Sequence, residues 1–258
     1  MERVAVAFSG GVDSTTLLKA AVETLGRSAV LALTSVAPSV PRREVEQAKT
    51  LAQDMGVQLI ELLTDELENP LYLINDANRC YFCKNTLFRD CLTVSRQYGI
   101  DHVLYGAILD DLGDVRPGMR AARELHIRGP LAEAQFEKDD VRQLARYWQL
   151  NVWDKPASAC LASRVARGVK VTAETLSMVE RSEDFLHDLG FLQVRVRHHD
   201  GHSARIEVNP NDILRVAERA EEIHAFLRGV GYRHISLDLG GYRQGSLNTE
   251  PVTERSLS

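Results

Sequence analysis

No run of apolar residues in the 258-residue chain is long enough to cross a membrane. The chain also lacks a strong basic excess: its net charge is −5, which argues against a protein whose main partner is a nucleic acid. The first residues have the pattern of a buried strand and not of a signal peptide. We therefore expect a cytoplasmic protein that binds neither a membrane nor a nucleic acid.

Cysteine is scarce, and the four cysteines are more typical of metal binding or catalysis than of disulfides in a reducing compartment. Cys80 and Cys83 form a C-x-x-C pair, a spacing that also occurs in redox dithiols, although nothing thioredoxin-like surrounds it. Cys91 shares helical spacing with the apolar residues Leu87 and Val94, so we expect a buried core thiol there.

Strand and helix patterns alternate over the first 150 residues. The expected strands are 3–8, 29–35, 58–62, 103–105 and 152–153, and the expected helices are 14–25, 42–55, 84–98 and 139–147. This alternation predicts an α/β domain with a parallel sheet covered by helices on both faces. Ligands of such sheets lie at the carboxyl ends of the strands, where Ser9, Ser35 and Gly106 fall.

The pattern changes near residues 164–172, beyond which a smaller α+β domain with an antiparallel hairpin is expected. Its expected elements are a helix at 172–188, strands at 191–197 and 203–208, a helix at 211–228 and a strand at 232–238. We place the first domain at 1–165, the second at 166–240, and a polar tail, disordered at its end, at 241–258.

The first expected strand leads into the loop Ser9-Gly10-Gly11-Val12-Asp13-Ser14. It lacks the Gly-Lys-Ser/Thr ending of a Walker A loop. Two glycines allow backbone amides to point at an anion, and the N-terminus of the following helix adds partial positive charge. Ser9 and Ser14 add hydroxyl donors, and Asp13 is placed to hold Mg²⁺. The loop predicts a pyrophosphate site; the alternative is an ordinary glycine-rich turn.

These residues resemble the PP-loop family of ATP pyrophosphatases, which includes GMP synthetase, NAD synthetase and tRNA thiolases. The resemblance implies that ATP is cleaved to AMP and pyrophosphate and that an adenylated carbonyl is left for a nucleophile. It places adenosine near Thr34 and Ser35. Gly106 and Asp110 match a further family segment, in which Ala107 and Ile108 stand here for a polar pair.

The chain is closely similar to the LarE family, the ATP-dependent sulfur transferases that mature the nickel-pincer nucleotide cofactor of lactate racemase. The segments that carry the resemblance are Asp110-Asp111-Leu112-Gly113-Asp114, Arg116-Pro117-Gly118 and Trp153-Asp154-Lys155-Pro156-Ala157-Ser158-Ala159-Cys160-Leu161-Ala162-Ser163-Arg164. It implies adenylation of a carboxylate of a pyridinium biscarboxylic acid mononucleotide and its conversion to a thiocarboxylate. The alternatives are a tRNA thiolase, an amide-forming NAD synthetase-like ligase and a non-catalytic nucleotide-binding module.

The same resemblance assigns Cys160 to the sulfur-donor position, with Asp13 and Arg164 as further catalytic candidates. In members with a C-x-x-C pair, three thiolates resemble the ligands of a [4Fe-4S] cluster, here Cys80, Cys83 and Cys160, with one iron open to carry sulfide. Sacrifice of Cys160, leaving dehydroalanine, and a zinc or purely structural role are the alternatives. The family also suggests a homo-oligomer and a separate sulfide or sulfur donor, which the sequence does not identify.

Apolar residues alternate with charged ones in the expected strands 191–197 and 203–208. This period puts Arg195, Arg197, Arg205 and Glu207 on one face. With Arg164 they form a candidate site for a phosphate or carboxylate of the substrate, and a solvated sheet face is the alternative. Between the strands, His198-His199-Asp200-Gly201-His202 predicts a solvated hairpin turn.

Overall fold

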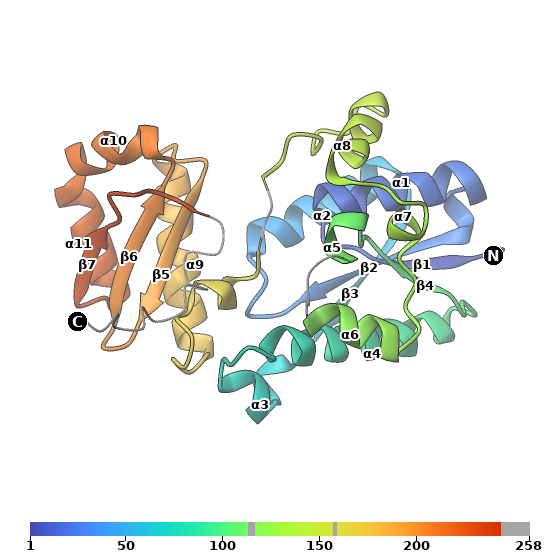
Figure 1. Ribbon diagram of the computed structural model, residues 1–258, viewed down its shortest axis with the longest axis horizontal. Helices are drawn as coiled ribbons and strands as arrows, with labels where there is room; N and C mark the ends of the chain where they lie inside the picture. The colour runs from blue at the N-terminus through green and yellow to red at the C-terminus, as the bar shows by residue number, and fades with distance from the viewer. Residues whose placement is uncertain (113–116, 157–158, 244–258) are drawn as a thin grey trace, which may run out of the picture. The chain divides into compact units, whose positions relative to one another are not determined.

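Four short strands, rich in valine, leucine and alanine, form a parallel sheet in the order β3-β2-β1-β4 (Figure 1). They are β1 (Val4–Ala7), β2 (Val30–Val36), β3 (Gln58–Leu63) and β4 (Val103–Tyr105). Val4 pairs with Val30 and Ala5 with Val103, so the first strand is central. The predicted α/β fold with a parallel sheet is confirmed.

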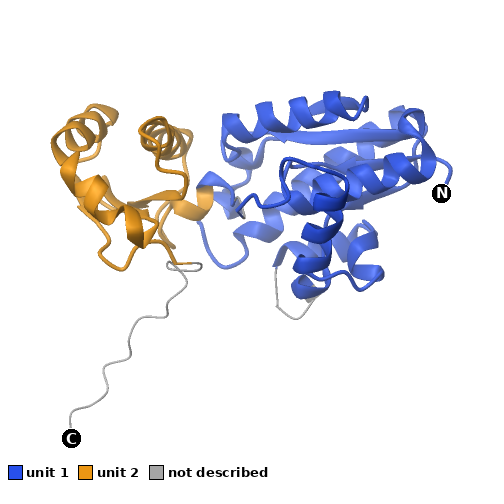
Figure 2. Cartoon of the chain, turned by 90° about the horizontal axis from the view of Figure 1, so that it is seen from above, with its two compact units in different colours: residues 1–161 blue, residues 162–258 orange. Residues whose placement is uncertain are grey.

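The computed structural model describes residues 1–112, 117–156 and 159–243. The chain divides into two units, 1–161 and 162–258, shown in different colours in Figure 2. The predicted tail beyond residue 243 and residues Gly113, Asp114, Arg116, Ala157 and Ser158 of the motifs lie outside the described residues. Within the described part, no helix is both long and apolar enough to span a membrane.

Helices cover both faces of the first sheet (Figure 1). The longer ones are α1 (Val12–Leu25), α2 (Arg42–Asp54), α4 (Arg79–Gln97), α6 (Pro117–Glu124) and α8 (Lys138–Tyr147). The short α and 3-10 helices in this part of the chain are η1 (Arg27–Ala29), η2 (Glu66–Glu68), α3 (Pro70–Leu73), α5 (Leu109–Leu112), α7 (Pro130–Glu133) and η3 (Leu161–Arg164).

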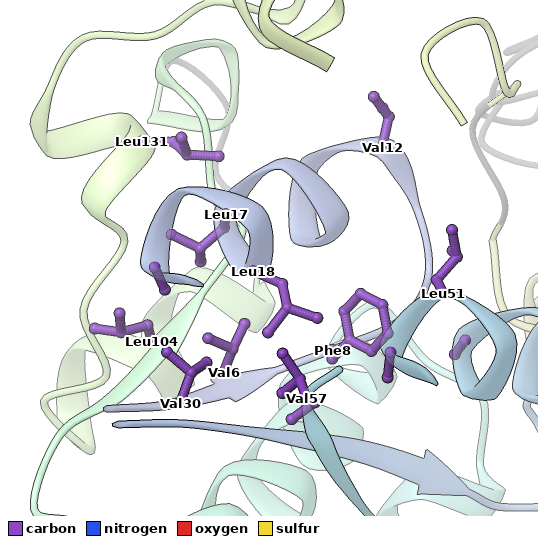
Figure 3. Close-up of a cluster of buried hydrophobic side chains, with 14 of the residues drawn as sticks. Val6, Phe8, Val12, Leu17, Leu18, Val30, Leu51, Val57, Leu104 and Leu131 are labelled. Carbon is purple, nitrogen blue, oxygen red and sulfur yellow. The ribbon is translucent and has the colours of Figure 1, made fainter. Parts of the chain in front are cut away.

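Alternate side chains of β1 enter separate apolar cores, as the period of a strand requires. Val6 belongs to the apolar core that Figure 3 shows, together with Leu18 of α1 and Leu51 of α2. Ala5 belongs to the other core, with Phe88 of α4. Burial on both faces explains why these strands read as continuous apolar runs.

The predicted strand at 152–153 is wrong. Residues 151–154 form a turn, in which Trp153 N donates to Leu150 O at 3.1 Å and Lys155 N to Val152 O at 3.1 Å. Val152 is fully buried in the core around β1, so its apolar character reflects packing and not sheet pairing. The helix expected at 84–98 begins earlier, at Arg79, which places the C-x-x-C pair in its first turns.

The second unit contains a three-stranded sheet in the order β5-β6-β7. Its elements are α9 (Ala173–Asp188), β5 (Val194–His199), β6 (Ser203–Val208), η4 (Pro210–Asp212), α10 (Ile213–Glu218), α11 (Ala220–Val230) and β7 (His234–Leu237). β5 and β6 form the expected antiparallel hairpin, while β7 pairs parallel to β6. The helix expected at 211–228 is interrupted at Arg219, where φ is −105° and ψ is 21°.

Helix α9 begins with a reciprocal cap. Thr172 Oγ1 accepts from Thr175 N at 3.1 Å, and Thr175 Oγ1 accepts from Thr172 N at 3.0 Å. The cap satisfies amide donors that the first helical turn leaves unpaired.

Thr172→Ala is expected to lower the free energy of unfolding by about 1 kcal/mol, because it removes the N-cap acceptor. Denaturant unfolding followed by circular dichroism measures it. Thr24→Ala is the matched control, since Thr24 only donates to Ala20 O within α1 and is exposed. Equal effects of the two substitutions would contradict a capping role for Thr172.

Candidate active site

The loop at residues 9–14 turns from β1 into α1 through Gly10 and Gly11. Gly10 has φ +70°, and a Cβ built there would lie 3.2 Å from Cα and Cβ of Ala48 in α2. Gly11 is the N-cap of α1 and has no side-chain cap bond. A glycine at position 10 is therefore required both by backbone conformation and by the close approach of α2.

Ser9 and Ser14 close the loop. Their hydroxyls lie 3.1 Å apart, Ser9 N donates to Ser14 Oγ at 3.2 Å, and Ser14 Oγ lies 3.2 Å from Gly11 O. Val12 is buried in the apolar cluster that includes α1, on the side of the helix away from β1 (Figure 3). The loop is thus anchored by one apolar side chain and held by its own serines, the arrangement expected for binding an anion with backbone amides.

Two lysines from distant segments reach this loop. Lys138 Nζ, from the start of α8, contacts both carboxylate oxygens of Asp13 at 2.7 and 2.8 Å. Lys155 Nζ lies 2.6 Å from Glu44 Oε2 and 3.4 Å from Gly10 O. The sequence prediction assigned a role to neither lysine; Lys155 stood in the motif at 153–164, whereas nothing in the local pattern indicated Lys138.

The Asp13 carboxylate is thus paired with the positively charged Lys138 side chain. It is also partly exposed, at 28% of its side-chain surface. Carboxylate oxygens are ligands that Mg²⁺ prefers. Asp13 therefore fits the predicted role of a divalent-cation ligand. In that role the Lys138 ammonium would move from Asp13 to the phosphates.

The other predicted nucleotide residues follow β2 and β4. Thr34 is buried, and Ser35 Oγ lies 2.7 Å from Thr64 Oγ1. Gly106 ends β4 directly against α1: a Cβ there would lie 2.8 Å from Ser14 N and 3.0 Å from Asp13 C. Asp110 is exposed on α5. Because Ala5, Ala7 and their neighbours pair in parallel with β2 and β4, these strand ends meet at one edge of the sheet.

A buried carboxylate, Glu66 in η2, organises the adjacent polar groups and is only 2% exposed. It accepts hydrogen bonds from Ser39 Oγ and, at 3.1 Å, from Thr64 Oγ1. Ser39 O in turn accepts from Leu161 N at 2.7 Å. The residue that follows Cys160 is therefore tied to this network.

Cys160 and Cys80 lie near enough to Cys83 to raise the pKa of its thiol, and none of the four cysteines forms a disulfide. Burial, with smaller contributions from Cys160 and Glu66, raises the pKa of the Cys83 thiol to about 12. Although burial alone lowers the pKa of Arg79, the thiols of Cys160 and Cys80 raise it. Cys91 is fully buried in the core of α4, as predicted, and its burial raises its pKa to about 12.

As they stand, no three His, Cys, Asp or Glu side chains among the described residues form a group that could hold one metal ion. A cluster of four irons spaces its thiolate ligands further apart than a single ion does. Three thiols have the donor chemistry that such a cluster needs.

In the second unit, Arg164 is 2% exposed and is held by Glu183. Its Nε and Nη2 each donate to a Glu183 oxygen at 3.0 Å, and Val196 N donates to Glu183 Oε1 at 2.9 Å. Arg164 was predicted to bind the substrate, but its guanidinium group is already bound to the buried Glu183 carboxylate.

The face predicted from the strand period is formed, since Arg195 pairs with Glu207 and Arg197 with Arg205 in the register of the hairpin. Glu207 is fully buried and accepts from Arg197 Nε at 2.9 Å and from Arg205 Nη2 at 3.0 Å. The alternative of a solvated face is therefore wrong around Glu207. Arg195 is half-buried, with its guanidinium 5.2 Å from the Tyr242 ring; burial and the neighbouring Arg164 lower its pKa.

The histidine segment forms the predicted turn, but its first residue is not solvated. His198 is 3% exposed, and its Nδ1 lies 3.4 Å from the Tyr232 hydroxyl. Burial lowers its pKa, and His202 and His199 lower it further. His198 lies on β5 before the turn and belongs to the core, which explains the error.

Gly106→Ala is expected to destabilise the protein by about 1–3 kcal/mol, because its methyl group meets backbone atoms of α1 that cannot move without displacing the loop. ATP binding should weaken with it. Thermal denaturation and calorimetric titration with ATP measure the two effects. Gly229→Ala is the control, because nothing lies within 4 Å of the added methyl, and stability should then be unchanged or higher.

Glu183→Gln is expected to cost about 3–5 kcal/mol of stability, because it leaves the buried Arg164 guanidinium without a counter-charge. Denaturant unfolding measures the loss. Glu133→Gln is the matched control: its partner Arg128 is 51% exposed, and such exposed pairs contribute little to stability. A small effect at position 183 would show that Arg164 does not depend on this carboxylate.

Comparison with known proteins identifies relatives along the whole chain. The NAD synthase family matches residues 1–76. An uncharacterized protein of Synechocystis sp. is 42% identical over 250 residues, which are 96% of this chain and 92% of that protein. An uncharacterized protein of Methanocaldococcus jannaschii is 28% identical over 245 residues, 94% of this chain and 91% of that protein.

The pyridinium-3,5-bisthiocarboxylic acid mononucleotide synthase of Lactiplantibacillus plantarum is 36% identical over 258 residues, which are 100% of this chain and 93% of that enzyme. The similarity thus extends over both units. The chain belongs to the LarE family of sulfur-inserting synthases within the PP-loop ATP pyrophosphatases, and it is an ATP-using enzyme of that family.

Proposed function

We propose that this enzyme adenylates a carboxylate of a pyridinium biscarboxylic acid mononucleotide and converts it to a thiocarboxylate, a step toward the nickel-pincer cofactor of lactate racemase. One observation carries the proposal: the segment that contains Cys160 is held to the nucleotide loop on one side and to the adjacent Glu66 network on the other. Lys155 Nζ lies 3.4 Å from Gly10 O, and Leu161 N donates to Ser39 O at 2.7 Å.

The first step needs a leaving group, because a carboxylate resists nucleophiles. A substrate carboxylate oxygen attacks the α-phosphorus of ATP, and pyrophosphate leaves. The amides of Gly10 and Gly11, the Ser9 and Ser14 hydroxyls and Mg²⁺ on Asp13 would hold the pyrophosphate. Lys138 and Lys155 would neutralise the charge that develops on it.

In the second step a sulfur nucleophile attacks the acyl carbon, and AMP leaves with the electrons of the acyl–oxygen bond. Cys80, Cys83 and Cys160 would hold a [4Fe-4S] cluster, which when bound supplies a fourth iron position for sulfide. Each turnover consumes one sulfide, so the proposal includes an external sulfur donor. We propose a homo-oligomer, as in the family that the sequence resembles.

The arginine face of the second unit would bind the phosphate of the mononucleotide. Arg205 is 31% exposed at its side chain, and Arg195 is half-buried, so these two are the proposed contacts. Arg164 and Arg197, with side chains 2% and 7% exposed, would act mainly by fixing the face through Glu183 and Glu207.

Cys83→Ala is expected to abolish iron binding and thiocarboxylate formation but to retain pyrophosphate release, because the nucleotide loop is untouched. The assay combines anaerobic reconstitution, iron and sulfide quantification, and detection of pyrophosphate and product by mass spectrometry. Cys91→Ala is the control and should retain all three activities, because Cys91 is packed in the core of α4.

Other outcomes would identify other functions. An iron-free enzyme whose Cys160 loses H₂S after turnover would replace the cluster with the sacrificial route. AMP release that depends on ammonia and not on the cysteines would indicate an amide-forming ligase. A stable complex with tRNA at physiological salt would indicate a tRNA thiolase.

A further inference from the structure

The sheet of the second unit is polar on one face across all its strands. Val194 of β5, Ile206 of β6 and Leu237 of β7 lie on the other face, in the core that α9, α10 and α11 cover. Residues paired in the register share a face, and side chains alternate along each strand. The polar face therefore consists of Arg195, Arg197 and His199 of β5, Ser203, Arg205 and Glu207 of β6, and His234 and Ser236 of β7. The site described above gives His199 no role.

His199 carries a buried nitrogen that lacks a hydrogen-bond partner. The residue as a whole is partly exposed, but its Nε2 atom is buried and makes no hydrogen bond in the described parts of the chain. Arg205 Nε is buried in the same way: it lies 3.5 Å from Asp238 Oδ2 in an ion pair but makes no hydrogen bond. Buried polar atoms are nearly always paired, so two such nitrogens on one face indicate a ligand or an ordered water that pairs with them.

The register of the hairpin makes these two side chains neighbours. Arg197 lies opposite Arg205, and His199, which follows on the same face of β5, lies opposite Ser203. His199 and Arg205 are thus diagonal neighbours, a relation in which the Cα atoms lie about 7–8 Å apart and long side chains still reach one another. One phosphate group, accepting through different oxygens, is large enough to contact both.

The charges on this face favour an anion. Glu207, the carboxylate closest to the centre of the face, is fully buried and already accepts from both Arg197 and Arg205. Burial, and next Arg205, lower the pKa of His199, although Glu207 raises it. The imidazole is therefore neutral at physiological pH, and one of its nitrogens donates while the other accepts. A phosphate presents acceptor oxygens, which favour the tautomer that donates through Nε2.

We propose that His199 donates a hydrogen bond from Nε2 to the phosphate of the mononucleotide, beside the guanidinium of Arg205. This inference rests on the proposed function, which places that phosphate on the arginine face, and it adds the residue that distinguishes the nucleotide from its nucleoside. The phosphate does not react, so the contact is equally strong in the ground state and the transition state. His199 therefore acts on KM and not on kcat.

His199→Leu tests this role, because it removes the donor and leaves a side chain in its place. We expect its affinity for the pyridinium biscarboxylic acid mononucleotide to fall about tenfold or more, since a hydrogen bond to a charged group is lost. Its affinity for the nucleoside that phosphatase treatment produces from this nucleotide should equal that of the wild-type enzyme. Calorimetric titration with the two compounds measures both affinities.

Two further substitutions separate the donor from the shape of the side chain. The amide nitrogen of glutamine can take the place of Nε2, so His199→Gln should bind the nucleotide nearly as tightly as the wild-type enzyme. The amide nitrogen of asparagine corresponds to Nδ1 instead, so His199→Asn should show the loss, and it provides the test if His199→Leu does not fold. His224→Leu is the matched control, because His224 is exposed on α11, which packs against the opposite face of the sheet.

The outcomes are distinct from those for the proposed function. A wild-type enzyme that forms thiocarboxylate, with His199→Leu and His199→Asn binding the nucleotide as tightly as it does, overturns the role of His199 alone. A structural role, such as holding an ordered water, would change thermal stability but not the difference between nucleotide and nucleoside. A wild-type enzyme that binds the two compounds equally overturns the phosphate site. Nucleotide binding that depends on His199 without thiocarboxylate formation would support His199 and contradict the proposed reaction.

Discussion

The close approach of β4 to the first turn of α1 is the constraint on which the nucleotide site depends. Gly106 packs so tightly that a Cβ would lie 2.8 Å from Ser14 N, and on the other side Gly10 packs against Ala48 of α2. The loop is therefore held between two backbone contacts that admit no side chain. Preorganised amides of this kind lose little entropy on binding an anion, which is how a loop without a Walker A lysine can still bind pyrophosphate.

Buried carboxylates hold the polar groups near the cysteines and the arginines of the second unit in place. Glu66, Glu183 and Glu207 are 2%, 5% and 0% exposed. A buried charge is tolerated only when it is paired and hydrogen-bonded, and each of the three accepts at least two hydrogen bonds. The partners differ: hydroxyls at Glu66 beside the cysteines, and guanidinium groups at Glu183 and Glu207. The same device thus orders two chemically different regions.

The parallel sheet and the Ser9–Ser14 loop were predictable, because strand periodicity and a glycine pair are local signals. The arginine face was predictable as a face, since register follows from the alternation of Val194 and Val196 with Arg195 and Arg197. The burial of these arginines was not predictable, because the partner Glu183 lies on a helix and no local sequence pattern distinguishes it. Lys138 reaches Asp13 across 125 positions of sequence. Contacts between distant segments depend on packing, which periodicity does not encode.

The proposed link between ATP cleavage and sulfur delivery is supported by where these long-range contacts lie. An acyl adenylate is an activated ester that water also hydrolyses, so the sulfur must reach the acyl carbon before water does. The segment with Cys160 is held to the loop through Lys155 and to the Glu66 network through Leu161. In the proposed reaction, the segment that delivers the sulfur is thus attached to the same unit as the loop that binds ATP. The buried Ser39–Glu66 pair, which holds Leu161 through Ser39 O, would then serve this reaction by fixing the residue after Cys160.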